Sequence, residues 1–211
     1  MNSYFFDISD LEKELRQLPH LHRVAFAASI CERMLPNYNA FSQMENWGIP
    51  SVPRKALDEI WQILEGKPTD VVEIRQLRED CSRENILPDS DDFYDSYYLA
   101  EAQEALFAIC STLLACIDLD LQNIIWVVKS ARFNTIELFI RARDESFKAS
   151  HYKDKKNKLE AIANHSLAVR EMAKENEDLQ RLKEMKTLER EFLEWLRTSF
   201  NNDGKSIIDA S

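Results

Sequence analysis

The stretch LAEAQEALFAICSTLLACIDL, Leu99–Leu119, decides the fold. Drawn as a helix with 3.6 residues per turn, it is apolar on nearly every side. A helix that is hydrophobic all round belongs in the interior of a domain, because neighbouring elements must cover each of its faces. This stretch therefore predicts a central helix packed inside the protein.

Glycine is scarce in the chain, with three residues in 211 against a usual share of about 7%. Tight β-hairpin turns depend on glycine and asparagine, whereas helices do not. Leu, Ala, Glu and Lys are abundant. We therefore expect an all-α fold, a single-domain bundle of seven or eight helices over residues 1–200, with a mobile tail over residues 201–211.

Apolar periodicity and proline or glycine boundaries predict the helices around the central one. The run Ile124–Val128 could also form a strand, but the 3.6-residue period continues to Ile140 and favours a helix. The polar stretch 146–158 is the best candidate for a boundary. The expected helices cover residues 8–18, 20–35, 36–44, 52–65, 70–85, 99–119, 118–143 and 165–199.

The expected C-terminal helix, 165–199, is long and highly charged. A narrow stripe of four apolar residues follows helical spacing on it: Met185, Leu188, Phe192 and Trp195. Such a stripe is suited to docking on one neighbouring helix. We therefore treat it as a candidate interface, either within the chain or between copies in a homo-oligomer.

The charge balance opposes two classes of partner. The chain has 27 basic and 37 acidic residues, a net charge of −10, which disfavours non-specific binding to nucleic acid and to anionic membranes. No apolar run approaches the ~18 residues of a membrane-spanning helix, and MNSYFFDISD does not resemble a signal peptide. Four cysteines without a CxxC motif predict buried free thiols. A cytoplasmic location is expected.

Two motifs for known chemistry are absent from the sequence, because no HExxH or GxSxG occurs. His20 and His22 would point some 200° apart on a helix and cannot share a metal ion. The acidic run from Asp89 to Asp95 lacks the glycine of a calcium loop, and we expect it to complement the dipole of the following helix. No metal or cofactor is expected.

The stretch CERMLPNYNAF, Cys31–Phe41, carries the most distinctive polar residues. Helical angles place Glu32 at the edge of the buried face and Arg33 on the far side, with His22 and Ser29. We expect Glu32 to be partly buried and paired, and Arg33 to be available to acids near Asp91. The candidate polar network or binding site comprises Glu32, Arg33, Asn37, Tyr38, Asp91, Asp92 and Tyr94.

Three blocks of the sequence resemble the YjaG-like bacterial family, a domain of unknown function. Glu-Arg-Met-x-Pro-Asn-Tyr falls on Glu32–Tyr38, Leu-Asp-x-Ile-Trp on Leu57–Trp61, and Asp-Asp-Phe on Asp91–Phe93. Leu35 departs from the pattern, because an aromatic residue is expected there. The resemblance implies one compact α-helical domain in a bacterial cytoplasmic protein, and it implies no reaction.

Three hypotheses for function follow. The preferred one is a protein without catalysis that acts through protein–protein contacts. The second is a small-molecule or enzyme site between the second helix and residues Asp89–Tyr98. The third is an acidic inhibitor, such as an immunity protein, that neutralises a basic partner; the net charge favours it only weakly.

Overall fold

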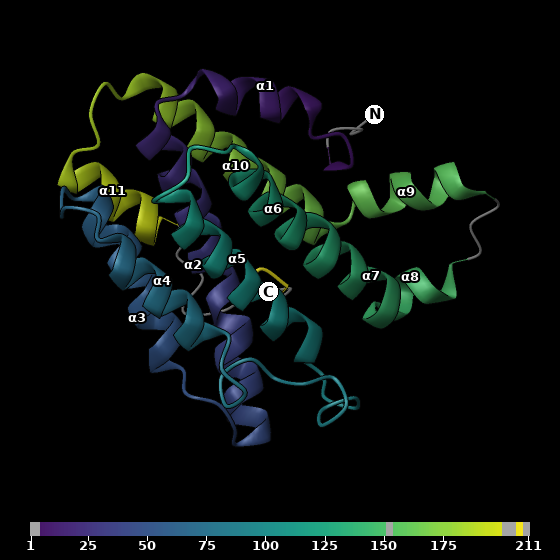
Figure 1. The fold of residues 1–211 in the computed structure, drawn as a ribbon. Helices are drawn as coiled ribbons and strands as arrows, with labels where there is room; N and C mark the ends of the chain where they lie inside the picture. Colours follow the sequence, from purple (N-terminus) through teal and green to yellow (C-terminus); the bar gives the residue numbers. More distant parts are fainter. Residues whose placement is uncertain (1–4, 151–153, 200–205, 209–211) are drawn as a thin grey trace.

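The computed structural model describes residues 5–150, 154–199 and 206–208. Every regular element in these residues is a helix (Figure 1), which confirms the all-α class. The elements are α1 Ser9–Gln17, α2 His20–Glu45, α3 Ser51–Leu64, α4 Val71–Cys81, α5 Leu99–Ala115, α6 Gln122–Lys129, the π-helical segment η2 Ser130–Glu137, α7 Leu138–Arg143, α8 Glu145–Ala149, α9 Lys155–Ala163, α10 Ser166–Glu184 and α11 Arg190–Thr198. These segments outnumber the seven or eight expected, mainly because the C-terminal region is divided.

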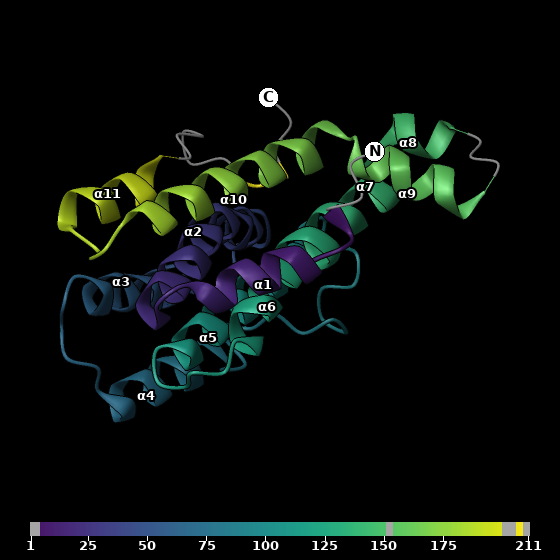
Figure 2. The ribbon, with the colours of Figure 1, turned by 90° about the horizontal axis from the view of Figure 1, so that it is seen from above.

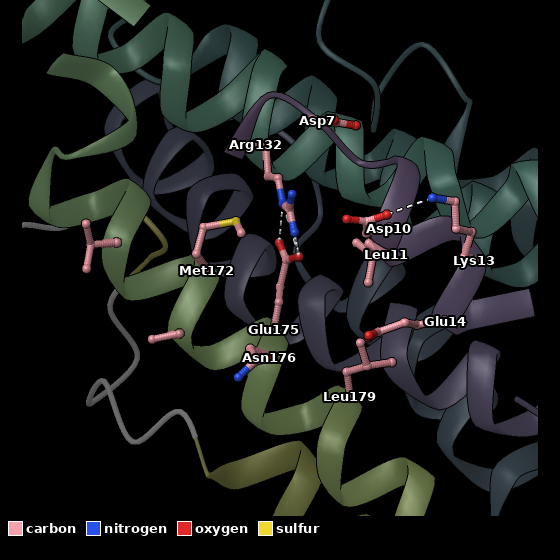
Figure 3. A pocket seen from close by; sticks show the side chains of 12 residues that line it. Asp7, Asp10, Leu11, Lys13, Glu14, Arg132, Met172, Glu175, Asn176 and Leu179 are labelled. Carbon is pink, nitrogen blue, oxygen red and sulfur yellow. Dashed lines mark hydrogen bonds and ion pairs between the residues drawn. The ribbon is translucent and has the colours of Figure 1, made fainter. Parts of the chain in front are cut away.

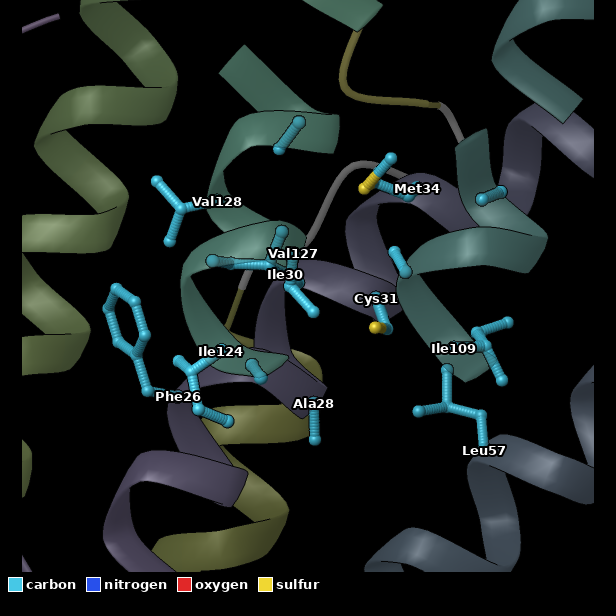
Figure 4. Packing of buried hydrophobic residues seen from close by; sticks show 14 of the residues in the cluster. Phe26, Ala28, Ile30, Cys31, Met34, Leu57, Ile109, Ile124, Val127 and Val128 are labelled. Atoms are coloured by element: carbon cyan, nitrogen blue, oxygen red, sulfur yellow. The ribbon is translucent and has the colours of Figure 1, made fainter. Parts of the chain in front are cut away.

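The core lies between α2 and α5. α5 packs against α2, α3, α4, α6 and η2, so the central position expected from its sequence is confirmed. Figure 4 shows side chains of α2, α3, α5 and α6 meeting in this core, among them Cys31, Leu57 and Ile109, which are fully buried. One face of α5 is open, because Phe107 remains 46% exposed.

α2 does not end at Pro36. A separate helix was expected after residue 35, but α2 continues as one helix to Glu45 with Pro36 inside it. A proline has no N–H, so the turn loses one internal hydrogen bond. Burial on both sides of the proline offsets this loss, because Met34 and Phe41 are both fully buried. The backbone carbonyl of Arg33 also accepts a hydrogen bond from the amide of Ile207, at 3.0 Å.

The β-branched run Ile124–Val128 is helical, as its continuing period predicts. α6, η2 and α7 follow one another without a break from Gln122 to Arg143. Eight residues in the middle, Ser130–Glu137, form the π-helical segment. π-Helical turns are rare and are found frequently at functional sites.

The expected helix 165–199 is broken. α10 ends at Glu184, the backbone is extended at Met185 (φ −82°, ψ 128°), and α11 starts at Arg190. α10 and α11 together lie along one side of the bundle, with α4 on the other (Figure 2). α10 packs on α2 and η2.

Part of the expected mobile tail is packed against the core. Ser206, Ile207 and Ile208 are buried, and Arg170 of α10 donates a hydrogen bond to the carbonyl of Ile207 at 2.8 Å. The rest of the expected tail, residues 201–205 and 209–211, lies outside the described residues. Ile207 therefore bridges α2 and α10 through its own backbone.

Two further findings concern the described residues as a group. No helix in this part of the chain is both long and apolar enough to cross a membrane. Nor do these residues bring together three His, Cys, Asp or Glu side chains that could hold a metal ion. All four cysteines are free thiols, and burial raises the pKa values of Cys31 and Cys116 to about 12.

Candidate functional site

The polar stripe of α2 is buried under α10. Arg33, which was expected to point away from the core, is only 1% exposed. His22 and Ser29, on the same stripe, also face the C-terminal region: His22 contacts the carbonyl of Met185 at 3.1 Å, and Ser29 donates to Asp178 at 2.9 Å. The expectation for Arg33 was wrong because the helical angles show which residues share a face, but not what covers that face.

Arg33 forms the centre of this buried contact. Its Nη2 donates to Glu171 Oε1 at 2.6 Å and its Nε donates to Glu171 Oε2 at 2.9 Å, a bidentate pair. Its Nη1 donates to Asp178 Oδ2 at 3.2 Å. Burial lowers the pKa of Arg33, but the carboxylates of Glu171 and Asp178 outweigh this effect and the net direction is upward.

A second bidentate pair lies one turn along α10. Arg132 of η2 donates through Nε to both carboxylate oxygens of Glu175, at 3.1 Å, and through Nη2 to Oε2. Both residues are at most 2% exposed. Burial raises the pKa of Glu175, although the Arg132 guanidinium opposes the shift.

Lys174 adds a third buried cation to this contact, with its Nζ 2.6 Å from Asp178 Oδ1. We call the following six residues the ionic seam: Arg33, Arg132, Glu171, Lys174, Glu175 and Asp178. The seam holds three cations and three carboxylates, so it is neutral as a whole. Buried charges are tolerated when they are paired and hydrogen-bonded in this way.

Glu32 belongs to a different cluster on the other side of α2. It accepts hydrogen bonds from Arg54 at 2.7 and 2.8 Å and from Trp61 Nε1 at 2.7 Å. Arg197 of α11 lies 3.3 Å from it. The expectation that Glu32 is partly buried and paired is met, with a side chain that is 16% exposed. Glu32 and Arg33 therefore point to different partners.

Asn37 and Tyr38 are both fully buried. Tyr38 donates to the carbonyl of Ile86 at 2.8 Å, and burial raises its pKa to about 12. Neither polar atom of the Asn37 side chain has a hydrogen-bond partner among the residues that the structure describes. Tyr38 thus fixes the loop before α5, and Asn37 has no such role.

The remaining expected site residues lie outside this region. Asp91, Asp92 and Tyr94 are exposed in turns before α5. Asp89 accepts from the backbone N–H of Asp91 at 2.7 Å, which is turn chemistry, and no side chain caps α5. Among the described residues no ion pair joins this segment to Glu32 or Arg33.

The apolar stripe proposed as an interface packs partly within the chain. Phe192 is buried, and Met185, Leu188 and Trp195 are partly buried against the core. Two cations also lie over the ring of Trp195: Arg181 is 3.8 Å and Lys174 is 4.4 Å from the ring centroid. The turn after α10 folds α11 back and covers much of the stripe.

A groove opens between α1 and α10, above the second bidentate pair of the seam (Figure 3). Its volume is about 700 Å³. The two helices run alongside each other in the same direction in Figures 1 and 2. We call it the α1–α10 groove; it is lined by Asp7, Asp10, Leu11, Lys13, Glu14, Arg132, Val169, Met172, Ala173, Glu175, Asn176 and Leu179.

Two contacts lie near the ends of the groove. At one end the buried Phe5 offers its carbonyl to Arg132 at 3.5 Å. At the other end Glu14 of α1 pairs with Lys183 of α10 at 3.0 Å. The walls between these contacts combine apolar side chains with acids, and Asp7 and Asp10 are exposed on the rim.

Sequence reasoning did not find this groove or the seam. One signal was present: Glu171, Glu175 and Asp178 follow helical spacing, so they share one face of α10. An acidic face matched to a polar stripe on α2 would have suggested an ionic contact. No sequence signal marks Arg132 as its second cation, because the contact depends on how η2 meets α10.

Comparisons with other proteins agree with this fold. Residues 10–209 match the model of a family described as "Protein of unknown function (DUF416)". The chain is 37% identical over 95 residues to the uncharacterized protein YjaG of Escherichia coli, covering 45% of this chain and 46% of that one. It is 32% identical over 108 residues to an uncharacterized protein of Haemophilus influenzae, covering 51% and 53%. The aligned part therefore spans about half the length of these relatives.

A crystal structure of a DUF416 family protein from Shewanella baltica is similar along almost the whole chain. The TM-score is 0.78 at 25% sequence identity, and the match covers 95% of this chain and 97% of that one. The family model covers nearly all of the helices described above. This chain belongs to the DUF416 family.

Proposed function

We propose that this protein acts by binding another protein, without catalysis, and that the α1–α10 groove is its contact site. The observation that supports the proposal is the groove itself. It is an open channel with apolar walls and an acidic rim, and the Arg132–Glu175 ion pair lies beneath it. Arg132 and Glu175 pair with each other there and form the floor of the groove.

The shape of the groove favours a macromolecule over a small metabolite. Pockets for small molecules bury most of the surface of their ligand. Here Asp7, Asp10 and Ala173 are exposed along the rim, and Val169 is 42% exposed. A ligand in this groove would keep one side in solvent, as a segment of a protein partner does.

A paired capture experiment tests the proposal. Ala173→Trp fills the groove, and Ala100→Trp adds the same ring at an exposed position on α5, away from it. Both tagged variants and the wild-type protein are used to capture proteins from native lysate at matched amounts. We expect at least one protein captured by wild type and Ala100→Trp to be lost from Ala173→Trp. Equal capture by all three would contradict the proposal.

A further inference from the structure

Resting on the function proposed above, we infer that the α1–α10 groove receives a basic amphipathic helix of the partner protein. The charges of the lining favour a cationic occupant. Four of the lining residues are acids, Asp7, Asp10, Glu14 and Glu175, and two are cations, Lys13 and Arg132. This difference of four acids against two cations leaves the lining with a charge of −2.

Lys13 pairs with Asp10 at 2.8 Å and Arg132 pairs with Glu175, and both cations are already counted in this charge. Lys183 lies just outside the lining and pairs with Glu14 at 3.0 Å, so counting it as well changes the charge from −2 to −1. Asp7 has no ion pair among the described residues: it accepts a hydrogen bond from the amide of Ser9 at 3.0 Å, and hydrogen bonds from Ser9 together with the nearby charge of Lys13 lower its pKa. Asp7 is exposed at the rim and ionised at neutral pH.

The apolar residues of the groove are spaced so that the side chains of a docked helix can contact them. On α10 they are Val169, Met172, Ala173 and Leu179, with Asn176 between them. From residue 169 to residue 179 the wall extends about 15 Å, close to three helical turns. Leu11 lies on the opposite wall. A helix docks in such a groove by placing apolar residues at i, i+3 or i+4, and i+7 into it.

The two walls suit an amphipathic occupant. Apolar side chains would fill the channel over the Arg132–Glu175 floor, while lysine or arginine at the edge would reach Asp7 and Asp10. The net charge of −10 would attract such a segment from a distance. An acidic helix would instead meet like charges along α1, which costs affinity.

Defined peptides test this inference on the full chain. The probe is a fluorescein-labelled peptide of about four helical turns, with Leu at i, i+4 and i+7 and Lys on both flanks. A matched peptide carries Glu in place of Lys, and spermine serves as a small polycation. We expect the basic peptide to bind, with fluorescence anisotropy rising, and the acidic peptide and spermine to bind at least about tenfold more weakly.

Two charge-reversal variants locate the binding. Asp7→Lys/Asp10→Lys changes the rim, and Asp91→Lys/Asp92→Lys makes the same charge change before α5, at the other end of the bundle (Figure 1). We expect the rim variant to weaken binding about tenfold or more and the control to leave it within about twofold. Equal weakening by both, or equal binding of the acidic peptide or spermine, would overturn the inference.

The outcomes also separate this inference from the proposed function. If the basic peptide does not bind while Ala173→Trp still loses a captured protein, the basic helix is wrong and the contact site stands. If Ala173→Trp captures the same proteins as wild type, the contact site itself fails. Ala173→Trp should also weaken binding of the basic peptide at least about tenfold, because the indole ring occupies the groove.

Discussion

Replacing Arg33 with methionine should destabilise the protein severely. Arg33 is the cation that forms an ion pair with Glu171, and both side chains are 1% exposed. In Arg33→Met the Glu171 carboxylate stays buried beside Glu175 without a cation of its own, whereas Asp178 keeps Lys174 at 2.6 Å. Removing one partner of a buried ion pair costs about 3–5 kcal/mol, a large part of the ~5–15 kcal/mol that stabilises a typical domain.

Urea unfolding measures this cost. We expect the midpoint to fall with little change in slope, because the surface exposed on unfolding is nearly the same. The control is Arg16→Met, which breaks an exposed pair one turn apart on α1, with Arg16 65% and Glu12 30% exposed. That change should cost no more than about 0.5 kcal/mol.

The double variant Arg33→Met/Glu171→Met removes both charges of the pair, so neither of them stays buried without its partner. Apolar side chains in place of a buried ion pair are often neutral in stability. We therefore expect the double variant to recover at least about 2 kcal/mol relative to the sum of the single variants. Additive losses, or a loss below about 1 kcal/mol for Arg33→Met alone, would refute the role of the seam.

Three further changes test other features by urea unfolding. Gly48 and Gly66 both have positive φ, +81° and +104°. A Cβ at Gly48 would lie 2.6 Å from the Tyr38 hydroxyl, whereas nothing lies within 4 Å of a Cβ at Gly66. Gly48→Ala should therefore lower the free energy of unfolding by about 1 kcal/mol or more beyond the effect of Gly66→Ala, and equal losses would contradict the packing. Hydrogen bonds from Ser146 and from the backbone of Phe147 lower the pKa of Asp144 from 3.8 to about 2. The wild-type protein should therefore be more stable than Asp144→Asn above about pH 4, and this advantage should be lost as the pH falls toward 2. A difference in stability that does not change with pH would show that the carboxylate is not the cause. Asn37→Leu should leave stability unchanged or raise it by about 1 kcal/mol, because both polar atoms of Asn37 are buried and have no partner in the described part of the chain. A loss of about 2 kcal/mol would show that the amide is needed.

The sequence predicts the fold class because its signals are local. The few glycines, the apolar stretch of α5 and the helical period through Ile140 each act within one segment. The structure departs from the expected boundaries where tertiary contacts intervene. Pro36 sits inside α2 because burial on both sides and the docked Ile207 hold that helix together.

The ionic contacts are harder to predict, because burial of a charge depends on a distant segment. Arg33 lies on the polar side of α2, and a polar side normally faces solvent. Glu171 and Asp178, which cover it, lie 138 and 145 residues away. Glu32 could be predicted to be partly buried, because its helical angle lies beside the core; its partners Arg54 and Arg197 could not.

The groove depends on three segments that come together only in the folded chain: α1, η2 and α10. No motif marks it, and its walls carry ordinary amphipathic spacing. The residues that the sequence made prominent, from Glu32 to Tyr38, are packed into the bundle. In this chain the most distinctive stretch of the sequence is therefore packed into the bundle, and the proposed contact site lies elsewhere.

Site-specific photo-crosslinking in living cells tests the central claim most directly. A benzoyl-phenylalanine at position 173, in the wall of the groove, is compared with the same residue at position 100, on α5. We expect an ultraviolet-dependent adduct with another protein from position 173 and none from position 100. An adduct from position 100 alone, or no adduct from position 173 in cells that make the protein at its natural level, would contradict it.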